Sequence, residues 1–91
     1  MAENNTLEVL KALSDKTRLE IVRLLLDGER CVCQIFPMVK RTQSTVSIQL
    51  ATLEKAGLIE SRRDGKKIFY KIKDYRIRKI LKAAGFNEKS D

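Results

Sequence analysis

The sequence predicts an α+β fold in which helices precede a β-hairpin and a last helix follows it. Apolar residues recur with helical spacing in four segments before Gly57 and in one segment near the C-terminus. Between them, Asp64-Gly65 separates two expected strands and is a strong signal for a two-residue hairpin turn. With 91 residues, the chain is expected to form one domain over positions 1–91.

Four helices are expected before the hairpin. The first begins near Thr6, and the second begins at Asp15 behind Ser14 as its N-cap. A short third helix follows, and Thr42 caps the fourth. The apolar positions that define these helices are, in order, Leu7, Leu10, Leu13; Leu19, Val22, Leu25, Leu26; Val32, Ile35, Phe36, Val39; and Val46, Leu50, Leu53.

The expected strands are Leu58–Arg63 and Lys66–Lys73, and the tail at 87–91 is expected to fray. Helical spacing predicts a last helix on Ile77, Ile80, Leu81 and Ala84. This order is typical of a winged helix-turn-helix domain, with about five helices and a two-stranded wing. In such domains the second helix of the motif enters the DNA major groove, and the wing contacts the DNA backbone.

The net charge of +7 is concentrated in the second part of the chain. Residues 1–57 carry eight Lys or Arg against seven Asp or Glu, whereas residues 58–91 carry eleven against five. Such a basic segment favours an anionic partner such as nucleic acid. The alternative is that the lysines only form a solvated face.

Composition excludes several classes of function. The chain has no histidine and no phosphate-binding glycine loop, so Ser–His and Cys–His catalysis and histidine metal sites are excluded, and we expect no enzyme. No apolar run reaches the roughly 18 residues that a membrane span needs. The first residues show no signal-peptide pattern. We therefore expect a cytoplasmic protein without a membrane partner.

The fourth expected helix has an outer face suited to reading DNA. When Val46, Leu50 and Leu53 face the core, short polar side chains occupy the opposite face and its flanks. Hydroxyl groups can bond to base edges, and a glutamine could pair with adenine. Ile48 is either a contact to a thymine methyl group or an ordinary exposed residue. The candidate base contacts are Gln43, Ser44, Thr45, Ser47, Ile48, Gln49 and Thr52.

The expected hairpin carries four basic residues near its tip. A turn at Asp64-Gly65 would place Arg63 opposite Lys66 and Arg62 opposite Lys67. Like charges that lie directly opposite destabilise a hairpin, and a DNA phosphate between them would reverse that effect. We therefore assign these four residues to phosphate binding. The alternative is a tip that only improves solubility.

Three stretches of the chain carry a family resemblance. They read LKALSDKTRLEIVRLL, ERCVCQI and TQSTVSIQLATLEKAGLIESRRDGKKIFYKI, and they cover most of residues 7–72. In order and spacing they resemble the ArsR/SmtB family of metalloregulatory repressors. The resemblance implies a homodimer that binds double-stranded DNA as a repressor and leaves it when an effector binds. A two-fold dimer predicts an imperfect inverted repeat as operator. The family's interface uses the first and last helices, here offering Leu7, Leu10, Ile77, Ile80 and Leu81.

Several positions depart from the family pattern. Many members have Arg-His where this chain has Ile48-Gln49, so its base recognition should differ. The family's second metal site, on the last helix, uses histidine and carboxylates. This chain has no histidine and offers only Asp74 there, so we expect that site to be absent. Phe36 occupies the position of the third cysteine of the arsenic-sensing pattern.

Cys31 and Cys33 are the candidate effector site. In a regular helix their side chains would point about 200° apart, which is too far for one ion. Pro37 favours a helix that begins near Gln34, since a proline in a helix interior removes a hydrogen bond. The Cys-Val-Cys stretch would then lie at or before the helix start, where both thiols can turn toward one ion. The helix N-terminus and Arg30 would favour thiolates.

No cofactor is expected to be required for DNA binding. The expected effector ion is trivalent arsenic or antimony, with another ligand beside the two sulfurs; cadmium, lead and zinc are the alternatives. A redox sensor is a further alternative, in which oxidation, or bonding to another chain, is favoured over a disulfide within the pair. The cysteines could also have no sensing role.

Two other functions fit the same fold. One is an architectural nucleic-acid binder, whose DNA affinity would not depend on its thiols. The other is a winged helix that contacts proteins, which would bind DNA weakly and with little salt dependence.

Overall fold

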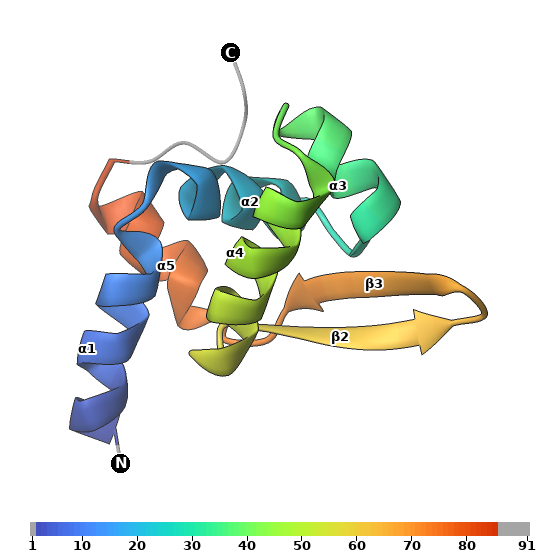
Figure 1. Ribbon diagram of the computed structural model, residues 1–91. Helices are drawn as coiled ribbons and strands as arrows, with labels where there is room; N and C mark the ends of the chain where they lie inside the picture. The colour runs from blue at the N-terminus through green and yellow to red at the C-terminus, as the bar shows by residue number, and fades with distance from the viewer. Residues whose placement is uncertain (1, 86–91) are drawn as a thin grey trace.

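The computed structural model describes residues 2–85 of the chain, with side chains from residue 6 onward. The elements are α1 (Ala2–Leu13), α2 (Lys16–Leu26), β1 (Arg30–Cys31), α3 (Val32–Met38), α4 (Gln43–Lys55), β2 (Ile59–Asp64), β3 (Lys67–Ile72) and α5 (Arg76–Ala83) (Figure 1). The expected helices and hairpin of a winged helix-turn-helix fold are confirmed. The expected fraying at 87–91 lies outside the described residues. No described helix is long and apolar enough to cross a membrane.

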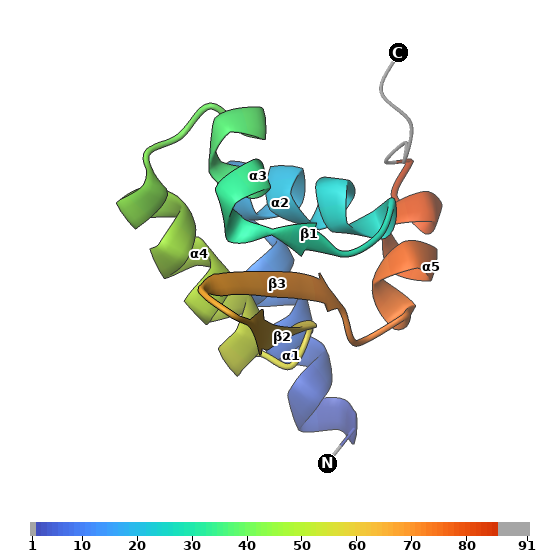
Figure 2. The ribbon, with the colours of Figure 1, turned by 90° about the vertical axis from the view of Figure 1, so that its right-hand side faces the viewer.

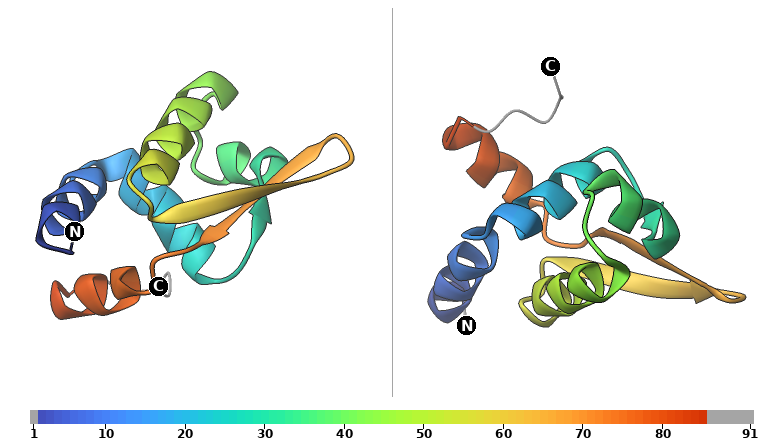
Figure 3. Two further views of the ribbon diagram at one scale, coloured as in Figure 1. Left: turned by 90° about the horizontal axis from the view of Figure 1, so that it is seen from below. Right: turned by 45° about the horizontal axis from the view of Figure 1, so that its top comes forward.

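The hairpin of β2 and β3 projects from one side of the helices, and α1 and α5 lie on the opposite side (Figure 1). Seen from the side of the hairpin, α4 lies to one side of the sheet and α5 to the other (Figure 2). Further views also place α1 and α5 on the side of the molecule away from the hairpin tip (Figure 3). Helix α3 contacts β3 and helix α4 contacts β2, so the helix-turn-helix pair lies next to the wing.

All five helices and both strands of the hairpin contribute to one hydrophobic core. The inward faces predicted for α2, α3 and α4 are confirmed, because their periodic apolar residues are buried or, for Leu19, Val32 and Phe36, partly buried against the core. The buried predicted positions in these helices are Val22, Leu25, Leu26, Ile35, Val46, Leu50 and Leu53. The same core holds Val9, Ala12 and Leu13 of α1, Ile59 and Ile72 of the sheet, and Ile77 and Leu81 of α5.

The first two helices begin at residues other than those expected. Helix α1 begins at Ala2, four residues before Thr6. The N-cap of α2 is Asp15, whose carboxylate accepts a hydrogen bond from the backbone N–H of Arg18 at 2.9 Å. The prediction of Ser14 as N-cap is wrong, because its hydroxyl instead donates to a carbonyl at the end of α1.

The hairpin turn lies one residue later than predicted. Asp64 pairs with Lys67, so the two central residues are Gly65 and Lys66. Gly65 has a φ of 65°, a conformation that glycine adopts without a steric penalty at the first central position of a hairpin turn. The conformational freedom of this glycine thus favours the observed register.

The expected opposition of like charges across the hairpin is therefore wrong. Arg62 lies opposite Phe69, and Arg63 lies opposite Ile68. The last pair before the turn, Asp64 with Lys67, joins opposite charges. The hairpin therefore contains no repulsion that a phosphate would have to relieve, so that argument for phosphate binding does not hold.

A third strand, β1, was not predicted, because two residues are too few to show strand alternation. Arg30 pairs with Tyr70 and Cys31 pairs with Phe69, which gives an antiparallel sheet in the order β1-β3-β2. The first cysteine therefore lies in the same sheet as the wing.

Two residues of α4 provide a test of its orientation. Leu50 is fully buried, whereas Ile48 is 64% exposed. We expect Leu50→Ala to lower the free energy of unfolding by about 2–5 kcal/mol, because it leaves a cavity in the core. Ile48→Ala, the control in the same helix, should change it by less than about 0.5 kcal/mol. Chemical denaturation at one fixed protein concentration measures both, and equal losses would contradict the orientation.

Candidate nucleic-acid interface

The N-terminus of α4 carries a group of hydroxyl side chains. The Thr42 hydroxyl caps the helix, accepting a hydrogen bond from the backbone N–H of Thr45 at 3.2 Å and donating to its hydroxyl at 3.0 Å. The Ser44 hydroxyl lies 3.4 Å from that of Thr42. A helix N-terminus with exposed hydroxyl groups can bind DNA phosphates or base edges.

The exposed face of α4 contains most of the predicted base contacts, namely Gln43, Ser44, Ser47, Ile48 and Thr52, whereas Thr45 and Gln49 are half-buried. Ala51 is also exposed, at i+3 from Ile48, and was missed. The helical spacing of Ala51 from Ile48 could have placed it on this face. Ala51 has no polar group, however, that would indicate a base contact. The hydroxyl of Thr52 is engaged, because it donates to the carbonyl of Ile48 at 3.1 Å.

Gln49 is engaged with α2. Its Oε1 accepts a hydrogen bond from the Nη1 of Arg18 at 2.7 Å, and the Nε of Arg18 donates to the carbonyl of Ala12 at 2.7 Å. Because a glutamine needs its oxygen to pair with adenine, this contact makes Gln49 less suited to base reading than the exposed residues. Arg18 therefore links the end of α1 to the middle of α4. No sequence pattern predicted this, because its partner lies 31 positions away.

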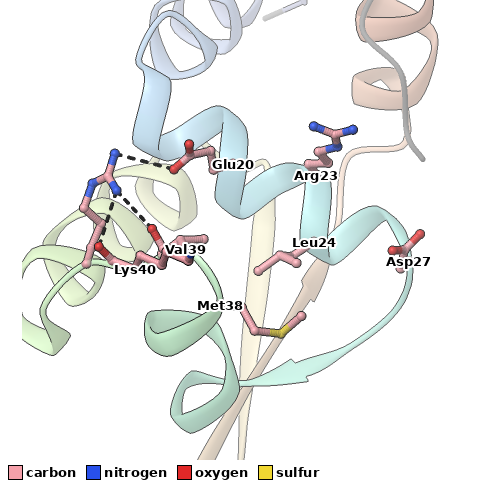
Figure 4. A pocket seen from close by; sticks show the side chains of 8 residues that line it. Glu20, Arg23, Leu24, Asp27, Met38, Val39 and Lys40 are labelled. Carbon is pink, nitrogen blue, oxygen red and sulfur yellow. Dashed lines mark hydrogen bonds and ion pairs between the residues drawn. The ribbon is translucent and has the colours of Figure 1, made fainter. Parts of the chain in front are cut away.

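The turn between α3 and α4 is attached to α2. A cavity of about 320 Å³ lies between them, with Leu24 and Met38 next to each other at its centre (Figure 4). At one end, the Nη1 of Arg41 donates to the carbonyl of Val39 at 3.0 Å, and its Nη2 lies 3.7 Å from the carboxylate of Glu20. Arg41 thus holds the turn in one position relative to α2, and α4 begins directly after it.

The basic residues of the wing fall into two groups. Arg63, Lys66 and Lys67 are exposed around the hairpin tip. Arg62 is also exposed, but its guanidinium has a partner within the chain, because its Nε and Nη2 donate to the two carboxylate oxygens of Glu29 at 2.9 and 2.8 Å. These hydrogen bonds lower the pKa of Glu29 and raise the pKa of Arg62.

The cysteine pair lies at the start of α3. Cys31 is the N-cap: its Sγ accepts a hydrogen bond from the N–H of Cys33 at 3.1 Å, and its own N–H donates to Oε1 of Gln34 at 3.0 Å. The predicted place of Cys-Val-Cys at the helix start is confirmed. The helix begins at Val32, however, and Pro37 lies inside it. The reciprocal cap between Cys31 and Gln34 accounts for this earlier start.

The two sulfurs are joined in a disulfide, and the Cα atoms of Cys31 and Cys33 lie 5.1 Å apart. Bonding within the pair, which the sequence analysis disfavoured, is therefore the form observed. Cys31 is extended, with φ −70° and ψ 145°, which allows its side chain to meet that of Cys33. Cys31 is only 3% exposed, and Cys33 is exposed, so solvent reaches the pair from one side.

Within the part of the chain that the structure describes, no third ligand accompanies the pair. Among the residues that the structure describes, no group of three or more cysteine, aspartate or glutamate side chains could hold a metal ion. Cys31 and Cys33 fit a thiophilic ion by their chemistry, but they supply only two sulfurs from one chain.

The predicted dimer residues differ in exposure. On α1, Leu7 is 55% exposed and Leu10 is 49% exposed. On α5, Ile77 and Leu81 are buried inside the chain, and Ile80 is half-buried against the core. Ile77 and Leu81 therefore have little surface left for a partner, because the core of this chain already covers them.

A helix-turn-helix pair whose second helix has an exposed face, beside a wing with a basic tip, is the architecture of winged-helix DNA-binding domains. Residues 15–61 match the family model described as "Bacterial regulatory protein, arsR family". The chain belongs to this family.

The chain is similar to several known proteins, of which three illustrate the range. An uncharacterized HTH-type transcriptional regulator of Methanocaldococcus jannaschii is 43% identical over 82% of this chain and 85% of its own length. The arsenical resistance operon repressor of Escherichia coli is 39% identical over 72% of this chain and 57% of its own length. The homodimeric winged helix-turn-helix DNA-binding domain of Mycobacterium bovis, a possible ArsR-family regulator, is 31% identical, with a TM-score of 0.83 over 92% of this chain and 78% of that one.

Proposed function

We propose that this chain is an operator-binding repressor whose DNA affinity depends on the chemical state of Cys31 and Cys33. One observation carries the proposal: both sulfurs meet at the N-cap of α3, the first helix of the helix-turn-helix pair. A ligand that changes the geometry of this cap changes the helix that packs beside α4. Release from DNA then requires only that the ligand binds the non-DNA-bound conformation more tightly. Such a repressor acts in the cytoplasm, where it meets DNA.

The DNA contacts come from two surfaces. The exposed face of α4 enters the major groove, with Ser44, Ser47 and Ile48 near the base edges. The wing tip binds phosphates through exposed side chains, those of Arg63, Lys66 and Lys67. We assign Arg62 to the structure of the wing, because its guanidinium already binds Glu29.

The proposed effector is a thiophilic ion, with trivalent arsenic or antimony first and cadmium, lead or zinc as alternatives. The E. coli relative is named for arsenical resistance, which supports a metalloid. Two sulfurs need further ligands, so a small thiol, water or another residue completes the shell around arsenic. The ion binds the two thiolates, so the disulfide must be reduced first.

Thiol oxidation is a second candidate signal, and the disulfide between Cys31 and Cys33 favours it. In this case a peroxide takes two electrons and two protons from the thiols as the S–S bond forms, and it is reduced to two waters or, for an organic hydroperoxide, to an alcohol and water. A dithiol reverses the step and itself becomes a cyclic disulfide.

We propose that the regulator acts as a homodimer on an imperfect inverted repeat. Leu7 and Leu10 of α1 are exposed apolar residues at the end of the molecule away from the wing tip, and Ile80 of α5 is half-buried there. A second copy of the chain is the proposed occupant of this face. The homodimeric M. bovis domain, which has the same fold, supports a homodimer.

The wing assignment is tested by Lys66→Ala combined with Lys67→Ala. If each lysine binds one phosphate, the slope of log K against log salt should become shallower by about 0.9 per lysine, so by about 1.8 in total. Lys71→Ala, in the same strand but paired with Glu60, is the control and should leave the slope unchanged. Fluorescence anisotropy on operator DNA at several salt concentrations gives the slopes. An unchanged slope in the double variant would remove the wing tip from the interface.

The cysteine assignment is tested by Cys31→Ser combined with Cys33→Ser. Serine is a good N-cap, so α3 should form and DNA affinity should stay close to that of the reduced wild type. The reduced proteins are bound to DNA from upstream of the gene and titrated with trivalent arsenic, cadmium, zinc and a peroxide. We expect release of the wild type by one of them and no release of the variant. A variant that is released like the wild type would exclude the cysteine pair as the sensor.

The dimer face is tested by Leu10→Glu. A charge at this exposed apolar position should prevent a second copy from packing there, because an unpaired buried charge is costly. Ile48→Glu is the control, since it adds the same charge at an exposed apolar position on α4. Size-exclusion chromatography with light scattering should show a monomer for the first variant and a dimer for the second. A dimer in both cases would place the interface elsewhere.

A further inference from the structure

Arg62 is held from three sides within the sheet region. Its planar guanidinium makes two hydrogen bonds to the carboxylate of Glu29, which is the strongest geometry for this pair of groups. The guanidinium also lies over the ring of Phe69, 4.7 Å from its centroid, and Nη1 is 3.8 Å from the carboxylate of Asp64. This arrangement fixes the position of a wing side chain relative to the segment before β1.

The same contacts connect the cysteine pair to the wing. Cys31 lies directly opposite Phe69 across β1 and β3, and Phe69 lies directly opposite Arg62 across β3 and β2. Arg62 in turn binds Glu29, which precedes Cys31 by two residues. These four residues, with Arg30 between Glu29 and Cys31, form a closed ring that crosses all three strands.

We propose that Glu29 is a positioning residue that transmits the state of Cys31 and Cys33 to the wing. Strand β1 has only two residues, and one of them is Cys31, which also caps α3. A change at this sulfur therefore alters the pairing of a strand that has few other bonds. Through Glu29 and Arg62 that change reaches β2, which leads to the basic tip. Its consequence for DNA binding rests on the proposed function.

A neighbouring ion pair provides the comparison. Glu60 and Lys71 join β2 to β3 with 3.7 Å between charged atoms, and neither residue belongs to β1. The two-pronged Glu29 pair should contribute more to stability than the single contact between Glu60 and Lys71, but a purely structural role predicts that losing either pair leaves the response of the wing to the cysteines unchanged. The inference predicts instead that only the Glu29 pair affects communication between the cysteines and the wing.

The test measures amide hydrogen exchange in residues 59–72 by mass spectrometry. Each protein is compared in its disulfide form and after reduction by a dithiol, which breaks the S–S bond, yields two thiols and becomes a cyclic disulfide. Wild type, Glu29→Gln and Glu60→Gln are compared. The first two have identical sequences in this segment, so any difference between them reports structure and not intrinsic exchange chemistry.

Reduction should change exchange in the wild-type wing by roughly fivefold or more, the lower end of ordinary coupling between sites. Glu60→Gln should keep this change, and Glu29→Gln should lose it. Arg62→Lys retains the charge but not the two-pronged contact, so it should also lose the change in exchange on reduction. This variant replaces Glu29→Gln in the test if Glu29→Gln does not fold. A wild-type wing that does not respond to reduction would overturn the inference, and so would a full response in both Glu29→Gln and Arg62→Lys.

DNA binding separates this inference from the proposed function. Suppose that exchange in the wild-type wing responds to reduction, but that neither an oxidant nor an ion changes the DNA affinity of the protein. This result would support the connection from Cys31 to the wing through Glu29 and would contradict the proposed function. If folded Glu29→Gln is still released from DNA and its wing responds to reduction as the wild-type wing does, only the inference about Glu29 is contradicted.

Discussion

The packing of Val46, Leu50 and Leu53 of α4 into the core beside α2 controls what the rest of the chain can present to DNA. Once this face is buried, helical geometry leaves Ser44, Ser47 and Ile48 exposed on the other side. Burial of apolar side chains supplies the free energy, and it needs no contact from the outer residues. The outer face of α4 is therefore available to recognise a sequence without loss of stability.

Arginine side chains then fix how the elements lie relative to one another. Arg18 joins α2 to the end of α1 and to α4, Arg41 holds the turn before α4, and Arg62 joins the wing to the segment before β1. Each uses several donors of one planar group, which a lysine cannot do. The basic residues at the wing tip have no such partner within the described hydrogen bonds and ion pairs. Arg18, Arg41 and Arg62 therefore bind groups within the protein. Lys66 and Lys67, in contrast, are suited to an anionic ligand.

Cys31 belongs to both the three-stranded sheet and the helix-turn-helix pair. It is a strand residue opposite Phe69 and also the N-cap of α3, so it contacts both the sheet of the wing and the first helix of the helix-turn-helix pair. Cys33, inside the first turn of α3, is the more exposed partner. A chemical change at the exposed sulfur of Cys33 can thus reach the buried sulfur of Cys31 through the S–S bond between them. This arrangement is suited to a sensor.

The sequence by itself determined the order of the helices, the inward faces of α2, α3 and α4, and the hairpin, because these depend on spacing within one or two turns of chain. It also identified most exposed residues of α4 and the place of the cysteines at a helix start. Tertiary structure decided the register at Gly65, the strand β1, the disulfide and the partners of Gln49 and Arg62. Those last two contacts join residues 31 and 33 positions apart. Local periodicity carries no information about such contacts, since they form only when separate elements pack together.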